Sequence, residues 1–135
     1  MRMLIIRVAV LALIAAASVA VSADGQAKSP FQNIKVQANT GSVTVKCPMN
    51  IIFTGNIVYN LPFAKGFVFN YHWGFSDGSK PTNPTLVKNP AGNMDIVKHT
   101  WNIKKSGSYT ITLFADSGTT HQGAGSDPAV NITCK

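Results

Sequence analysis

A chain of 135 residues with two cysteines and a formal charge of +7 is long enough for one domain and too short for two of ordinary size. It has no Glu and only five Asp, so a hydrolase built on paired carboxylates is hard to assemble from it. Its cations are mostly Lys spread along the chain, and Lys lacks the planar fork with which Arg grips phosphates and bases. The charge therefore indicates a solvated surface rather than nucleic-acid binding.

The first 23 residues have the pattern of a secretory signal. Arg2 and Arg7 give a basic start, residues 8–21 are almost wholly apolar, and small residues precede position 24. The uncharged run is shorter than the roughly 20 residues that a membrane-spanning helix needs. We therefore expect cleavage after Ala23, no membrane span in the mature protein, and a single domain over residues 24–135. That domain is expected to be secreted or periplasmic in a bacterium.

Beyond residue 29 the chain alternates apolar and polar residues and is rich in Val, Ile, Thr and aromatic residues, which predicts strands. No stretch shows the period of an amphipathic helix. The expected strands, in chain order, are 34–38, 42–47, 50–59, 67–75, 94–103, 108–115 and 129–134. A short edge strand at 85–87 is expected inside a Pro-rich loop. Gly55 suggests a β-bulge, and the Gly-rich stretch 117–127 is expected to be a mobile loop.

About seven strands without helices predict an all-β, immunoglobulin-like β-sandwich. An even pair of cysteines in an exported chain predicts one disulfide, Cys47–Cys134, which would join an early strand to the last one. Trp73 lies on the aromatic face of the central strand, and Tyr109 lies among apolar residues of the strand after the 105–107 turn. Both are expected to be core residues.

Three motifs add a resemblance. The segment Phe69 to Gly78 (FNYHWGFSDG) resembles the central strand and turn of PKD-type immunoglobulin-like domains, where an aromatic residue precedes Trp-Asp-Phe-Gly-Asp-Gly. Residues 97–101 and 107–113 look like that family's following strands, in the same order. Gly74 and Ser76 depart from the family pattern. The resemblance implies a sandwich and a binding role, because such domains usually act as spacers, adhesion modules, or protein- and glycan-binding modules.

A second resemblance covers more of the chain. Cys47-Pro48, residues 52–55, the central Tyr-x-Trp strand with its Ser-Asp-Gly turn, and the terminal Thr133-Cys134 look like small exported bacterial proteins of unassigned function. Those proteins are also single sandwich domains closed by their outer cysteines. This resemblance implies a fold and a compartment, and no activity.

No catalytic residue is predicted. The sequence has no Gly-x-Ser-x-Gly elbow and no phosphate loop, and the expected disulfide uses both cysteines. His72, His99 and His121 could form a metal site, but surface and core roles explain them more simply, so no metal or other cofactor is expected. A sugar-stacking role stays open for Trp101. A calcium site at one end of the sandwich also stays open, from Asp77, Asp95, Asp116 and Asp127.

Function is expected in the two longest irregular stretches, 80–93 and 117–127, because loops at the ends of a sandwich are free to recognise partners. The candidate binding residues are Lys80, Lys88, Thr120, His121 and Gln122. The sequence thus predicts an exported, monomeric, non-catalytic module that binds a protein or an envelope glycan, and no nucleic acid. A small structural or inhibitory envelope protein is the alternative, and a metal- or calcium-dependent enzyme the third possibility.

Overall fold

The computed structural model describes residues 29–63 and 66–135, so the expected signal segment lies outside the described residues. The described ranges form ten β-strands and no helix, and hence contain no helix that could span a membrane. In chain order the strands are β1 (Phe31–Ala38), β2 (Val43–Val45), β3 (Met49–Tyr59), β4 (Val68–Phe75), β5 (Thr85–Lys88), β6 (Met94–Ile103), β7 (Gly107–Tyr109), β8 (Ile111–Ser117), β9 (Thr120–Gly125) and β10 (Val130–Cys134).

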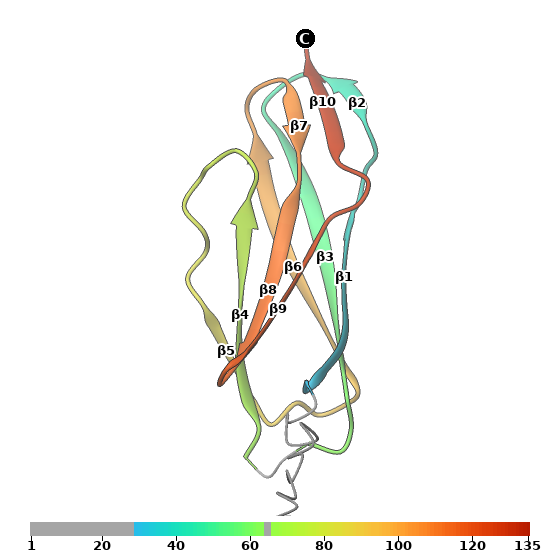
Figure 1. Cartoon of the computed structure of the whole chain (residues 1–135). Helices are drawn as coiled ribbons and strands as arrows, with labels where there is room; N and C mark the ends of the chain where they lie inside the picture. Colours follow the sequence, from blue (N-terminus) through green and yellow to red (C-terminus); the bar gives the residue numbers. More distant parts are fainter. Residues whose placement is uncertain (1–28, 64–65) are drawn as a thin grey trace, which may run out of the picture.

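The strands make an elongated immunoglobulin-like sandwich (Figure 1). One layer is the antiparallel sheet β1-β3-β6, and the other is β5-β4-β8-β9. A third, short sheet, β2-β10-β7, closes the end at which the C-terminus lies, with β2 parallel to β10 (Figure 1). The all-β prediction is confirmed. The structure has more strands than the roughly seven expected, because the expected strand 108–115 is divided into β7 and β8, the expected edge strand adds β5, and β9 forms where a loop was expected.

Alternation along the strands builds the core. In β3 the buried side chains are Ile51, Phe53, Ile57 and Tyr59, and their neighbours point outward. Facing them across the sandwich are buried residues of β4 and β8, such as Trp73, which is 3% exposed. Tyr109 is also buried, so both expected core residues are confirmed. Burying this apolar surface is the main favourable term in folding, and the period of two determines which face is buried.

The predicted disulfide is confirmed. Cys47 is bonded to Cys134, with their Cα atoms 5.3 Å apart.

The β-bulge suggested at Gly55 is not found. Gly55 pairs in regular register with Val36 on one side and Val97 on the other, and the register shift of β1 lies near its start instead. A Cβ at Gly55 would overlap the side chain of Leu113 in the opposite layer. The glycine is therefore needed for the close approach of the two sheets.

The prediction of a mobile loop over residues 117–127 is wrong for most of this stretch. Residues 120–125 form β9, which pairs with β8 and makes the edge of its sheet. The hairpin turns at Gly118, whose φ of 57° suits glycine. Gln122 and Ala124 are half-buried while Gly123 and Gly125 are exposed. The strand therefore alternates as expected, but its inward positions lack the large apolar side chains by which a strand is recognised in a sequence. The edge strand expected at 85–87 is confirmed as β5.

Candidate functional site

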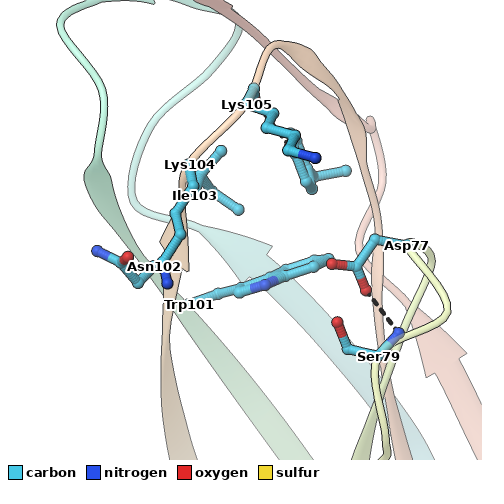
Figure 2. Close-up of a pocket in the computed structure, with 8 residues that line it drawn as sticks. Asp77, Ser79, Trp101, Asn102, Ile103, Lys104 and Lys105 are labelled. Atoms are coloured by element: carbon cyan, nitrogen blue, oxygen red, sulfur yellow. Dashed lines mark hydrogen bonds between the residues drawn. The ribbon is translucent and has the colours of Figure 1, made fainter.

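A hollow of about 450 Å³ opens at the end of the sandwich near the C-terminus, which we call the apical hollow (Figure 2). It lies between the turn that follows β4 and the turn that joins β6 to β7. Its volume is within the range of about 300–1,000 Å³ that is usual for ligand sites. The residues that line it are Asp77, Ser79, Trp101, Asn102, Ile103, Lys104, Lys105 and Tyr109.

The β6–β7 turn, residues 104–106, is anchored at two points. The hydroxyl of Tyr109 donates a hydrogen bond of 2.6 Å to the carbonyl oxygen of Lys105, an arrangement known in immunoglobulin-like domains as a tyrosine corner. The backbone N–H of Cys134 donates to the hydroxyl of Ser106 at 2.8 Å. Because Cys134 is also bonded to Cys47, the turn is tied to the covalently closed end of the domain.

The turn after β4 is equally well held. The backbone N–H of Ser79 donates to the Asp77 carboxylate at 2.9 Å, as Figure 2 shows, and Gly78 has a φ of 81° that suits glycine. Ser76 exchanges two hydrogen bonds with Thr110, which lies between β7 and β8. Hydrogen bonding from Ser79 lowers the pKa of Asp77. Asp77 therefore presents a charged carboxylate at the rim.

Trp101 forms the floor. Its ring lies between the two turns in Figure 2, and it packs edge-on against Tyr109 with ring centroids 5.1 Å apart, and against Phe75 at 4.9 Å. Only 8% of the residue is exposed. This low exposure contradicts the surface role that the sequence left open for stacking a sugar on Trp101. Trp101 gives the hollow a rigid apolar base.

The rim of the hollow carries two cations and one anion. Lys104 and Lys105 are exposed, and the salt bridges found among the described residues involve histidine and Asp116 only. An incoming anionic group can therefore pair with these ammonium groups without displacing a protein carboxylate. Asp77 can accept a hydrogen bond from a donor on the same ligand. The sequence showed Lys104-Lys105 as an adjacent basic pair without showing what lay beside it.

The structure does not bring the five predicted binding residues together. Lys80 follows Ser79 and is exposed near the apical hollow, whereas Lys88 ends β5 opposite Val68. Thr120, His121 and Gln122 are in β9, at the opposite edge of the same sheet from β5. The last three residues are parts of a paired strand and not of a mobile loop.

His121 does join a cluster on the outer face of that sheet. Its Nδ1 lies 2.6 Å from a carboxylate oxygen of Asp116, and the Nδ1 of His72 lies 3.6 Å from the other oxygen. The His72 ring lies nearly parallel to Phe114, with centroids 4.9 Å apart. The alternation of inward and outward residues could have predicted that His72 of β4 and Phe114 and Asp116 of β8 lie on one face of the sheet. Their grouping with His121 required the register of β9, which the Gly-rich sequence concealed.

The other predicted metal ligands are dispersed. His99 faces Phe75 and Trp73 inside the sandwich, where burial lowers its pKa. Asp95 accepts a hydrogen bond from the Tyr59 hydroxyl at the start of β6, far along the strand from the hollow beside Asp77. Burial of Tyr59, followed by its contact with Asp95, raises the pKa of the phenol. Within residues 29–63 and 66–135, no three His, Cys, Asp or Glu side chains are placed to hold a metal ion.

The sequence matches no protein-family model and no curated protein. Among solved structures, the chain is similar to the CARDB domain of the PF1109 protein from Pyrococcus furiosus, solved in complex with di-metal ions. The match has 10% identity and a TM-score of 0.52, and it covers 81% of this chain and all of that domain. A second match, to a β-glucosidase from Listeria innocua in complex with glucose, covers 75% of this chain and 16% of the enzyme, with 10% identity and a TM-score of 0.39.

The CARDB likeness shows the fold, because 10% identity carries no information about a site. It agrees with an immunoglobulin-like sandwich of the kind that the motifs around Trp73 imply. It does not confirm the narrower PKD type. The β-glucosidase match is too small to support any argument.

Proposed function

We propose that this domain is a non-catalytic recognition module that binds an exported protein partner at the apical hollow, with acidic side chains of the partner as the ligand. The observation that carries this proposal is that Lys104 and Lys105 stand on a turn fixed by Tyr109 and by the disulfide-linked strand β10. Sites that are ordered before binding avoid the entropy of ordering a loop on association. The backbone from which the two lysine side chains extend is thus fixed before binding.

The charges favour an acidic protein segment. A partner carboxylate can lie between Lys104 and Lys105, while Asp77 accepts a hydrogen bond from a backbone N–H of the same segment. The hollow has room for one or two side chains over the Trp101 floor. Because the lysines lie at an exposed rim, they contribute mainly to association rate and specificity, and binding should weaken as salt is raised.

The groups of the hollow suit binding better than catalysis. The lowered pKa of Asp77 keeps its carboxylate charged near neutral pH, which suits a fixed acceptor and not a proton donor. Both cysteines are held in the disulfide. The metal ions of the CARDB neighbour are not carried over, because the described residues hold no group of three ligands for an ion.

Export is part of the same proposal. The Cys47–Cys134 bond supports it, because structural disulfides persist in oxidising compartments and are rare in the cytosol. Expression of the whole chain in a bacterium with a secretory pathway should release a protein whose first residue is Asp24. Recovery of exported material that still begins at Met1 would contradict cleavage of the signal.

The binding site is tested with two variants of equal charge. In Lys104→Ala/Lys105→Ala the rim of the hollow loses both cations. In Lys35→Ala/Lys98→Ala the protein loses two exposed lysines of β1 and β6 that do not line the hollow. Each protein is immobilised and exposed to a cell-envelope extract, and bound partner is quantified over a range of salt concentrations. We expect the first variant to lose most of the salt-sensitive capture and the second to retain it. Equal losses would show that only net charge matters.

A further inference from the structure

A second surface lies on the outer face of the β4-β8-β9 layer, and it is centred on Phe114. This residue is 37% exposed although its ring contacts both neighbouring strands. A Cβ added to Gly123 in β9 would stand 2.9 Å from Cδ1 of Phe114, and one added to Gly74 in β4 would stand 3.0 Å from Cε2. The ring therefore reaches over the backbone of both neighbours, in space that any side chain at these two positions would take.

The inner side of the Phe114 ring is buried because it covers the backbone of the two glycines. Its exposed area is what the packing leaves open, and large aromatic side chains are usually buried more fully than this. Because Gly74 and Gly123 have no side chains, no side chain at these two positions covers the ring. The His72 imidazole stacks on the ring with centroids 4.9 Å apart, and the 37% of Phe114 that stays exposed is an aromatic surface in the middle of a sheet face.

Polar groups flank the ring on both sides. On one side stands the pair of Asp116 and His121, joined at 2.6 Å, with His72 beside them; the Nδ1 of His72 is buried and has no hydrogen-bond partner among the described residues. On the other side a groove of about 330 Å³ runs from Phe114 toward the turn after β4. That groove is lined by Gly74, Phe75, Ser76, Ser79, Pro81, Thr110, Thr112 and Phe114.

We propose that this face binds a neutral glycan, with one pyranose unit on the Phe114 ring and the next in the hydroxyl-lined groove. The C–H groups of a pyranose face pack on an aromatic ring, and the sugar hydroxyls need both donors and acceptors around it. Asp116 supplies acceptors, and the hydroxyl of Thr112 supplies either. A volume near 330 Å³ is at the lower end of ligand sites, which suits one sugar unit.

The charge of the face selects a neutral chain. The residues lining the groove include no charged side chain, and the carboxylate beside the ring is that of Asp116. An anionic glycan on the ring would meet the repulsion of this carboxylate, in contrast to the lysine rim of the apical hollow. The exposed Lys80 lies between Ser79 and Pro81, at the end of the groove away from the ring. The site shares Ser79 with the lining of the proposed protein-binding hollow and differs from it in the other lining residues and in ligand class, so either proposal can fail alone.

The test is a titration followed in amide NMR spectra of residues 24–135, with cellohexaose, maltohexaose and chitohexaose as probes at millimolar concentration. We expect at least one of them to shift the Gly74 and Gly123 amide signals, which lie under the two edges of the ring. Phe114→Ala should weaken that binding by about tenfold or more, corresponding to loss of the stacking surface. Phe114→Trp, which keeps an aromatic surface, should retain it.

Ile96→Ala is the matched control, because Ile96 is 59% exposed on β6 in the other layer. It should leave the titration unchanged. The Lys104→Ala/Lys105→Ala variant should also bind the glycan normally, which separates this site from the hollow. The proposal is overturned if none of the three hexasaccharides shifts the two glycine signals, or if Phe114→Ala binds as tightly as the parent protein.

Discussion

The hydroxyl of Tyr109 donates a 2.6 Å hydrogen bond to the backbone carbonyl of Lys105, so a core residue holds the rim of the candidate site. The ring of the same tyrosine packs edge-on against Trp101, the floor of the apical hollow. Floor and rim are therefore fixed by one side chain. Packing of the core and placement of the rim cations are linked through it.

Tyr109→Phe should separate these two roles, because it keeps the ring and removes the hydroxyl. We expect the free energy of unfolding to fall by about 0.5–1.5 kcal/mol, the usual net value of one hydrogen bond. The measurement is urea unfolding followed by tryptophan fluorescence. Tyr71→Phe is the control, since no hydrogen bond of the Tyr71 hydroxyl is found among the described residues, and it should change stability by less. Equal effects of the two substitutions would mean that the Tyr109–Lys105 bond contributes nothing.

Where local pattern and tertiary packing agree, the sequence predicts the fold well. The strands around Phe53, Trp73 and Trp101 alternate large apolar and polar residues, and their existence and inward faces follow from that period. The disulfide followed from the count of cysteines together with the expected export of the chain. β9 was not predicted because its half-buried positions hold Thr120, Gln122 and Ala124, which give little hydrophobic signal. The exposed positions between and after them are His121 and two glycines.

The candidate sites depend on contacts between distant segments. Asp77 and Lys105 lie in different turns, and only the folded sandwich brings both turns to one end. A usable signal did exist, since immunoglobulin-like domains place the Tyr of a tyrosine corner near the start of the strand that follows a turn, as Tyr109 follows the 105–107 turn. Phe114 was equally visible as an outward residue of its strand. Its two glycine neighbours become evident only from the pairing of β8 with β4 and β9.

The Cys47–Cys134 bond spans a sequence separation of 87 residues, and such a link restricts the unfolded chain strongly. We expect Cys47→Ala/Cys134→Ala to lower the free energy of unfolding by about 2–5 kcal/mol in urea titrations. The parent protein treated with reductant should show a similar loss, because the same link is opened. An unchanged midpoint in both samples would show that the bond does not stabilise the domain.

Gly55 should not tolerate a methyl group. Its Cβ would overlap Leu113 and stand 3.0 Å from Cη2 of Trp73, so Gly55→Ala should destabilise by about 1–3 kcal/mol through overpacking. Leu113→Val in the same chain makes room and should recover part of that loss, which a double-mutant cycle measures as coupling. Gly41→Ala is the control, because no atom lies within 4 Å of a Cβ there. Strictly additive effects of Gly55→Ala and Leu113→Val would rule out this contact as the cause.

His99 should make stability depend on pH in mildly acid solution. Its ring is half-buried, with its centroid 5.2 Å from that of Phe75 and 6.0 Å from that of Trp73, and burial lowers its pKa below the ordinary 6.5. As pH falls through about 6.5, the histidine of the unfolded chain takes up a proton before that of the folded chain, so the unfolded state is favoured and stability falls. Above that pH the imidazole is neutral in both states, and the full stability is present. The melting temperature should therefore decline between about pH 7 and pH 5. In His99→Leu that part of the decline should disappear, whereas His121→Gln, at an exposed position of β9, should leave it in place. The same slope in His99→Leu as in the parent protein would assign the pH dependence to other groups.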